Sequence, residues 1–366
     1  MYRFRAEIIK KMLARGYDVI VIAPNDGFTE QLIKLGCEYN HIKMDKKGSN
    51  PLQDFLTIKY LYKMYCNLAP DLIFHYTIKP NIYGSIAAKM AGITSIAVVT
   101  GLGYTFIQKS ITSTIAKYLY RFAFRYPYQV WFLNADDIQE FLNKNLIRKD
   151  KTLLLPSEGI DSKEFIPIST LKTQNKFVFL LLARMLWDKG IGEYIEAAKI
   201  IKTEFAEVEF QLVGSTDDQN PSAISLEQVM SWKQKGIVNY LGVVDDVRSI
   251  IASADCIVLP SYREGISRIL MESALMEKPL IAANVPGCKE VVENTVNGYL
   301  CEVKDKFHLA EVMKKMYLLP LEQRKRMGKH GRKKVIKEFD INFIVDQYFK
   351  TLAELDNYLY MESKEP

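Results

Sequence analysis

The chain has 366 residues, of which 48% are hydrophobic and 25% are charged, and its formal net charge is +6 at pH 7. This composition is typical of a globular protein and excludes disordered and collagen-like chains, and the length favours two domains over one. No apolar run is long enough to span a membrane, and the charged pattern at residues 1–13 lacks the apolar core of a signal peptide. The five cysteines are scattered and never spaced like zinc ligands, which indicates reduced thiols in a cytosolic protein.

Short apolar runs alternate with helical periodicity along the first half of the chain. The runs predict buried strands at 17–24, 70–76, 95–101, 128–134 and 151–157. Helical patterns lie between them, for example at 28–36 and 81–92. Strands that alternate with helices in this way predict parallel sheets with helices on both faces.

The alternation restarts after a stretch rich in Lys, Thr and Gln at 166–176. Further strands are predicted at 177–184, 209–214, 238–243, 255–260, 279–284 and 298–302. Two such series predict two doubly wound α/β domains, with ligands bound between them at the carboxyl ends of the strands. An amphipathic helix is predicted at 339–355.

The start of the chain departs from this pattern. A doubly wound domain normally opens with a strand, whereas residues 3–16 have helical periodicity. One explanation is a domain with one strand fewer. We favour the other, that the central first strand is missing from this chain, and expect about 10–20 upstream residues that encode a strand and its loop.

Two cations follow the strand predicted at 177–184. Arg184 ends that run, and Lys189 lies five residues further on. Two cations at the mouth of a sheet can neutralise a diphosphate without a metal, although cations at strand ends are common in any protein. The sequence has no Walker loop, only two of the three dinucleotide-fingerprint glycines at 101–106, and no Asp-x-Asp pair. We therefore predict no metal site.

Two glutamates mark a second candidate site. Glu264 lies in the loop after the strand at 255–260, and a helix is predicted to begin near Ser267. The free N–H groups and the positive dipole end at the start of such a helix favour a phosphate. Glu272 lies two turns later and can accept two hydrogen bonds from a ribose diol. The alternative is that both glutamates are ordinary solvated side chains.

Four segments together resemble the family 4 retaining glycosyltransferases of GT-B fold. They are "SEGIDSKEF" at 157–165, "ARMLWDKG" at 183–190, "EGISRILME" at 264–272 and "NVPGCKEVVENTVNGYL" at 284–300. The resemblance implies two doubly wound Rossmann-like domains with an inter-domain cleft. Residues 1–165 would form an acceptor-binding domain, onto which a C-terminal helix from about residue 340 to 366 packs, and 166–339 a nucleotide-sugar-binding domain.

The resemblance also implies roles for individual residues. Arg184 and Lys189 would bind the donor diphosphate. Glu264 would bind the donor sugar, and Glu272 the ribose. The other donor-binding candidates lie at the helix start or contact the base through their backbone: Gly265, Ile266, Ser267, Val243 and Val244. In this family the departing phosphate helps to deprotonate the acceptor hydroxyl, so we assign no protein nucleophile and expect no cofactor besides the UDP-sugar substrate.

The first half of the chain narrows the resemblance to one branch. "FHYTIKPNIYGSIAAKMAGI" at 74–93 and "TGLGYTF" at 100–106 resemble bacterial N-acetylgalactosaminyltransferases that extend undecaprenyl-diphosphate-linked sugars. The acceptor-side candidates are His75, Tyr76, Lys79, Asn81, Gly101, Gly103 and Tyr104. Tyr76 occupies the position at which many members carry a histidine that faces the donor sugar. A catalytic and a structural role for the neighbouring His75 are equally open.

A basic segment suits such a lipid-linked acceptor. Between Leu72 and Ala135 there is no Asp or Glu, yet there are six Lys and Arg residues. On the helix predicted within 109–128, one stripe is aliphatic or aromatic and another is basic. The first consists of Ile111, Ile115, Leu119 and Phe122, the second of Lys117, Arg121 and Arg125, and further aromatic residues are Tyr118, Tyr120, Phe124, Tyr126 and Tyr128. This pattern predicts a helix on an anionic membrane surface. The alternative is a packed helix with a solvated basic face, and no nucleic-acid-binding module accompanies the charge.

These features lead to one functional hypothesis. We expect an enzyme, peripheral on the inner face of the cytoplasmic membrane, that moves an N-acetylhexosamine or a hexose from a UDP-sugar to a polyprenyl-diphosphate-linked saccharide. Such products serve surface polysaccharide, O-antigen or glycoprotein glycan assembly. The alternatives are a soluble GT-B transferase with a free small-molecule acceptor and an inactive GT-B subunit that acts as a binding partner.

Overall fold

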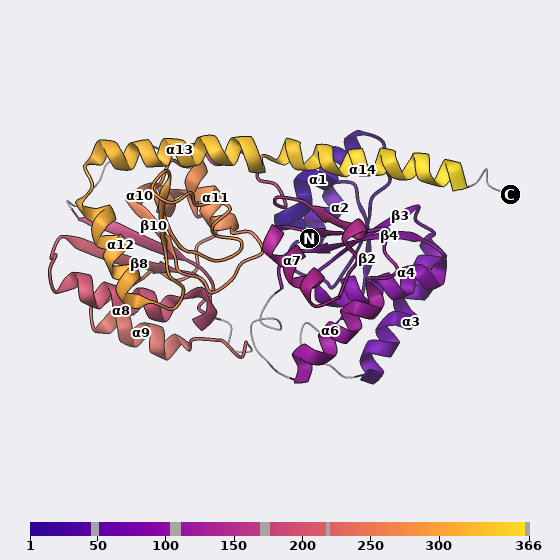
Figure 1. Cartoon of the computed structure of the whole chain (residues 1–366), viewed down its shortest axis with the longest axis horizontal. Coiled ribbons are helices and arrows are strands. Elements are labelled where there is room, and N and C mark those ends of the chain that lie inside the picture. The colour runs from indigo at the N-terminus through magenta and orange to yellow at the C-terminus, as the bar shows by residue number, and fades with distance from the viewer. Residues whose placement is uncertain (45–50, 103–110, 169–175, 217–219, 363–366) are drawn as a thin grey trace. The chain divides into compact units, whose positions relative to one another are not determined.

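The computed structural model describes residues 1–44, 51–102, 111–168, 176–216 and 220–362. The chain divides into two compact units, which Figure 1 draws in one view. Unit 1 comprises Met1–Gly159 and Asp340–Pro366, and unit 2 comprises Ile160–Phe339. Each unit has its own buried apolar core.

Unit 1 contains a four-stranded parallel sheet. In spatial order its strands are β3 (Leu72–Tyr76), β4 (Thr94–Val99), β5 (Gln129–Phe132) and β6 (Thr152–Leu154). Five of the six residues of β4 are buried. A strand that is buried on both faces reads as a continuous apolar run, and β4 was predicted from such a run.

A second, two-stranded parallel sheet in unit 1 pairs β1 (Ile20–Ala23) with β2 (Glu38–His41). The sequence did not predict β2. Its residues, EYNH, are exposed or half-buried and contain no apolar run, so its pairing with β1 alone defines it as a strand. Among the described residues no strand joins the two sheets of this unit. The expected additional strand stays a prediction.

The helices of unit 1 cover both faces of the four-stranded sheet. They are α1 (Tyr2–Ala14), α2 (Thr29–Lys34), α3 (Pro51–Leu68), the π-helical turn η1 (Pro80–Gly84), α4 (Ser85–Ala91), α6 (Ile111–Ala123), α7 (Ala135–Asn143), the 3-10 turn η2 (Lys149–Lys151) and α14 (Ile341–Glu362). Successive strand residues point to opposite faces. Phe74 accordingly contacts Tyr348 of α14, with ring centroids 5.1 Å apart, whereas His75 contacts Tyr65 of α3 and Ser85 of α4.

The C-terminal helix begins after a break. The preceding helix, α13 (Leu321–Phe339), belongs to unit 2, and α14 begins at Ile341 in unit 1. Tyr348 of α14 packs edge-on against Trp131 of β5, with ring centroids 4.8 Å apart. The sequence predicted this helix from about residue 340, close to its start at Ile341.

Unit 2 contains a six-stranded parallel sheet. In spatial order its strands are β12 (Gly298–Cys301), β11 (Leu280–Ala283), β10 (Cys256–Leu259), β7 (Phe177–Leu182), β8 (Val208–Val213) and β9 (Asn239–Tyr240). All six were predicted from the sequence. The strand order reverses direction between β7 and β10, and in doubly wound sheets ligands bind at the carboxyl ends of the strands at such a switch point.

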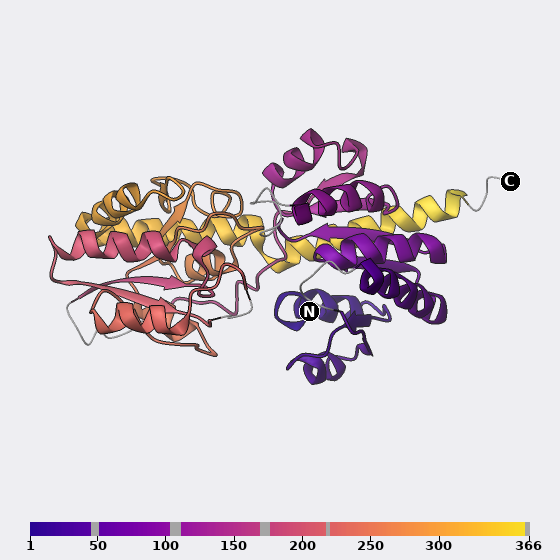
Figure 2. The same ribbon diagram turned by 90° about the horizontal axis from the view of Figure 1, so that it is seen from below.

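Helices lie on both sides of the sheet of unit 2. They are the 3-10 turn η3 (Trp187–Lys189), α8 (Ile191–Lys202), α9 (Leu226–Gln234), α10 (Arg248–Ser253), α11 (Arg268–Leu275), α12 (Lys306–Leu318) and α13. Figure 2 shows α8 and α12 on one side of the strands and α9 on the other. The motifs read from the sequence of unit 2 therefore follow strands of a covered, doubly wound sheet.

Candidate functional site

The first part of the site is the loop that follows β7. Arg184 is exposed at the start of this loop, and Lys189 is the last residue of η3. Gly190 follows with φ +71°, and a Cβ there would lie 2.0 Å from the carbonyl oxygen of Pro260. Tyr262 donates its backbone N–H to the carbonyl of Asp188 over 2.8 Å. The loop after β7 is thus held directly against the loop after β10, on either side of the switch point.

Lys189 and Glu264 meet where these two loops touch. The Lys189 Nζ donates to Glu264 Oε1 over 2.6 Å, and the two side chains are only 17% and 16% exposed. The cation predicted to bind a diphosphate and the carboxylate predicted to bind a sugar therefore neutralise each other. Both side chains lie at the carboxyl ends of the strands, where doubly wound sheets bind ligands.

The segment at 284–288 shapes the other side of Glu264. The Glu264 N–H donates to the Pro286 carbonyl over 3.0 Å, and the Ser267 N–H donates to the Gly287 carbonyl over 2.8 Å. A Cβ at Gly287, whose φ is +82°, would lie 2.5 Å from the Cβ of Glu264. Only glycine permits this close approach of the two loops.

Helix α11 carries the second glutamate. The helix begins beside Ser267, as the sequence predicted, and the Ser267 side chain caps it by accepting a hydrogen bond from the Leu270 N–H over 3.4 Å. Glu272 is buried at 9% exposure, and Arg268 Nε donates to its Oε1 over 2.7 Å. Burial raises the pKa of Glu272, and the Arg268 cation opposes that increase. Gly265 and Ile266, half-buried, lie between Glu264 and the helix start.

The two residues predicted to contact the base follow β9. Val243 is 68% exposed, and Val244 is half-buried against the core of unit 2. Because β9 is parallel to β7 and β10, this loop lies at the same edge of the sheet as the two loops above. The nine donor-side candidates thus come from one edge of one sheet.

On the acceptor side, His75 is part of the core of unit 1. It is 3% exposed, and its Nε2 lies 3.1 Å from the Tyr65 hydroxyl. The Ser85 hydroxyl lies 3.4 Å from its Nδ1, and a Cβ at Gly84 would lie 2.5 Å from the ring. Burial lowers the pKa of His75 to about 3, which keeps the ring neutral. Of the two roles left open by the sequence, this geometry favours the structural one.

Tyr76 is held by residues that the sequence did not point to. Its hydroxyl lies 3.0 Å from the hydroxyl of Tyr348, and the Arg5 guanidinium carbon lies 3.7 Å from its ring centroid. Arg5 also forms an ion pair with Glu158. Arg5 and Glu158 are 153 positions apart in the chain, and no sequence pattern signals such a contact.

The remaining acceptor-side candidates are divided between surface and core. Lys79 Nζ lies 3.5 Å from Asp54 of α3. Asn81 is buried and donates its side-chain N–H to the Val98 carbonyl over 2.9 Å, which ties η1 to β4. Gly101 is half-buried at φ +136°. Gly103 and Tyr104 lie outside the described residues.

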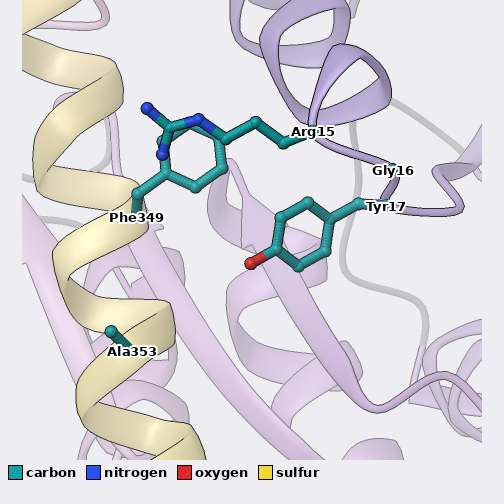
Figure 3. A pocket seen from close by; sticks show the side chains of 5 residues that line it. All are labelled: Arg15, Gly16, Tyr17, Phe349 and Ala353. Atoms are coloured by element: carbon teal, nitrogen blue, oxygen red, sulfur yellow. The ribbon is translucent and has the colours of Figure 1, made fainter.

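A surface pocket of unit 1 lies away from these residues. Figure 3 shows its lining of Arg15, Gly16, Tyr17, Phe349 and Ala353, with the Arg15 guanidinium over the Phe349 ring at 3.6 Å. Tyr17 precedes β1, so the pocket is at the amino end of that strand.

In the part of the chain that the structure describes, no group of three or more His, Cys, Asp or Glu side chains could hold a metal. No described helix is both long enough and apolar enough to cross a bilayer.

Comparisons with known proteins agree with this division into two units. Residues 162–334 match the family model "Glycosyl transferases group 1", and residues 2–133 match "Glycosyl transferase 4-like". The chain is 31% identical to the N,N'-diacetylbacillosaminyl-diphospho-undecaprenol alpha-1,3-N-acetylgalactosaminyltransferase of Campylobacter jejuni, over 96% of this chain and 94% of that protein. It is 26% identical to the UDP-Gal:alpha-D-GlcNAc-diphosphoundecaprenol alpha-1,3-galactosyltransferase of Escherichia coli, over 69% and 68%.

Solved structures with low sequence identity share the fold. A glycosyltransferase from Rickettsia africae has a TM-score of 0.78 at 20% identity, over 96% of this chain and 94% of that one. Anabaena Alr3699/HepE in complex with UDP and glucose has a TM-score of 0.79 at 20% identity, over 96% and 95%. These likenesses confirm the expected GT-B fold.

Proposed function

Because the chain belongs to the group 1 glycosyl transferases, we propose that this glycosyltransferase moves a sugar from a UDP-sugar to a saccharide carried on a polyprenyl diphosphate. The sugar is an N-acetylhexosamine or a hexose. The names of the Campylobacter and Escherichia relatives both include a diphospho-undecaprenol acceptor, and the first of them matches nearly the whole chain. The donor binds to unit 2 and the acceptor to unit 1.

The ion pair between Lys189 and Glu264 is the observation that carries the donor-site proposal. In the free protein each side chain neutralises the other at 2.6 Å. A donor diphosphate displaces Glu264 from Lys189, since a phosphate offers more charge and more acceptor oxygens than one carboxylate. Glu264 is then free to accept hydrogen bonds from the hydroxyls of the donor sugar. One exchange of partners would couple diphosphate binding to sugar recognition.

Charge supplied by the protein supports departure of the nucleotide. The bond between the sugar C1 and the diphosphate oxygen breaks, and negative charge grows on that oxygen beside Lys189, Arg184 and the N–H groups at the start of α11. The acceptor hydroxyl oxygen bonds to C1 on the same face. Its proton passes to the departing phosphate, so the configuration at C1 is retained and no protein nucleophile is needed.

The surface of α6 supports contact with a membrane. Ile115, Tyr118 and Phe122 are 45%, 69% and 46% exposed, so most of the described apolar stripe is not the packed face of the helix. Arg121 is exposed beside them. Tyr120 and Phe124 are buried in the core, which corrects the expectation that they too belong to the membrane-facing aromatic residues.

Helix α3 carries a similar apolar and basic surface. Its first turns expose Leu52, Phe55 and Leu56 by 69%, 63% and 49%, with Lys59 and Lys63 exposed further along. Both α3 and α6 pack on η1. Exposed apolar side chains interspersed with cations suit an anionic bilayer, and we propose that the protein is peripheral on the inner face of the cytoplasmic membrane.

A transfer assay tests this function. The full chain is incubated with a panel of UDP-sugars and a polyprenyl-diphosphate-linked saccharide, with EDTA present and absent. We expect turnover of at least one UDP-sugar under both conditions, because the phosphate-binding charge is supplied by side chains. Equal transfer to free saccharides would favour the alternative soluble transferase. Absence of all turnover would favour an inactive binding subunit.

A further inference from the structure

Arg268 occupies an unfavourable position for a cation. It is the first residue of α11, where the positive end of the helix dipole repels a positive charge. It precedes Glu272 by four positions, the weaker order for an ion pair on a helix. Helix stability therefore does not account for this arginine.

The geometry connects Arg268 to the candidate ribose site. Its Nε donates to Glu272 Oε1 over 2.7 Å, and the Arg268 and Glu272 side chains are 30% and 12% exposed. A carboxylate has two oxygens with about four acceptor positions. With Oε1 fixed by Arg268, Oε2 keeps a defined direction for a diol.

Among the described residues, one cation lowers the pKa of Glu272. Burial and the more distant Glu164 both raise its pKa, whereas Arg268 lowers it. Helix α13 packs on α11, but its Arg332 donates to the carbonyls of Leu275 and Phe165. Arg268 is thus the side chain that favours the ionised form of this buried carboxylate.

We propose that Arg268 is a positioning residue for recognition of the donor ribose, which it accomplishes by orienting Glu272 and keeping it ionised. This inference rests on the proposed function, because it assumes that a nucleoside diphosphate binds at α11. It concerns only the ribose hydroxyls. The diphosphate and the sugar are bound by other groups.

The test compares UDP with 2′,3′-dideoxy-UDP by calorimetric titration of the full chain. Arg268→Gln should weaken UDP binding on the order of tenfold, the loss expected for a hydrogen bond to a charged group, and should leave dideoxy-UDP binding unchanged. Arg268→Lys should restore part of the preference for UDP. Arg248→Gln is the matched control, because Arg248 is also the first residue of its helix and is also bonded to an acid, Asp246.

The pH dependence provides a second readout. Removing Arg268 should raise the pKa of Glu272 further. As the pH is lowered, the preference for UDP over dideoxy-UDP that remains in Arg268→Gln should therefore disappear at a higher pH than the preference of the unaltered protein. Glu272→Gln should have no such preference at any pH. If Arg268 had a purely structural role, its removal would not change the pH at which the preference for UDP over dideoxy-UDP is lost.

Three outcomes would overturn the inference. Equal weakening of UDP and dideoxy-UDP would assign Arg268 to the diphosphate. An unchanged preference for UDP in Arg268→Gln would remove any role at the ribose. Failure of the unaltered protein to bind UDP would overturn the donor site itself, and with it the proposed function. Thermal unfolding of each variant shows whether it is folded.

Discussion

The donor side of unit 2 and the acceptor side of unit 1 differ in how their polar residues are used. In unit 2, Lys189 and Glu264 pair with each other at the carboxyl edge of the sheet, where a ligand can replace one partner by another. In unit 1, His75 and Asn81 are buried and bonded to neighbouring core groups. Polar residues that follow strands are therefore not equivalent, and their burial and partners separate candidates for ligand binding from candidates for stability.

The largest effect is expected on the donor side. Lys189→Ala should lower the rate of sugar transfer by about 10²–10³-fold, the usual loss when one group that stabilises developing negative charge is removed. Initial rates with saturating acceptor provide the measurement. Lys199→Ala is the control, because Lys199 is exposed on α8 and pairs with Glu196. Transfer at the normal rate in Lys189→Ala would contradict the donor assignment.

The next effect concerns the surface of unit 1 that is proposed to bind a membrane. Replacing Lys117, Arg121 and Arg125 with glutamate should weaken binding to anionic vesicles by about 3 kcal/mol or more, at about 1 kcal/mol per basic residue near such a surface. Vesicle sedimentation at several salt concentrations measures this loss, and UDP binding should be unaffected.

A matched triple variant exists in unit 2. Lys325, Lys329 and Lys333 are exposed on α13 with the same spacing of four residues. Their replacement by glutamate should leave vesicle binding unchanged. Equal release by both triple variants would show that overall charge, and not the surface of α6, governs binding.

A smaller effect is expected at the Arg5 cluster. Arg5→Met should lower the free energy of unfolding of unit 1 by about 1–3 kcal/mol, because it leaves the Glu158 carboxylate without its charged partner in a part-buried position. Denaturant unfolding measures the change. If Glu158→Gln lowers the free energy of unfolding as much in the Arg5→Met background as it does alone, the two side chains are not coupled.

The smallest effect near neutral pH is a pH dependence of stability that arises from His75. Its pKa is about 3 in the folded protein, against about 6.5 when unfolded. The folded state therefore binds fewer protons between these values, and its stability should fall by up to about 1.4 kcal/mol per pH unit below pH 6.5. His75→Gln should remove this part of the acid sensitivity, whereas the same change at the exposed His330 should not.

The strands show which parts of this fold can be predicted. All strands of unit 2 were predicted, and β7, β10 and β11 are mostly buried runs of apolar residues. Strand β2 was not predicted, because its four residues are polar or aromatic and are exposed or half-buried.

The site residues show a similar limit. The spacing of Lys189 and Glu264 after two strands placed both at the same edge of a sheet, where their side chains meet. Their roles in donor binding, and that of Glu272, stay predictions. Arg5 meets Glu158 and Tyr76 only through tertiary packing. Local patterns carry no information on such contacts, nor on whether Tyr120 and Phe124 face outward or into the core.

The exchange of partners at Lys189 is tested most directly by Glu264→Gln. In the proposed exchange, Glu264 pairs with Lys189 in the free protein and must be displaced before the diphosphate binds. Once the donor is bound, Glu264 contacts only the donor sugar. The variant should therefore bind UDP at least as tightly as the unaltered protein in calorimetric titration, while it transfers sugar from a UDP-sugar far more slowly. A clear loss of UDP affinity in Glu264→Gln would contradict the exchange, because it would place Glu264 on the nucleotide itself.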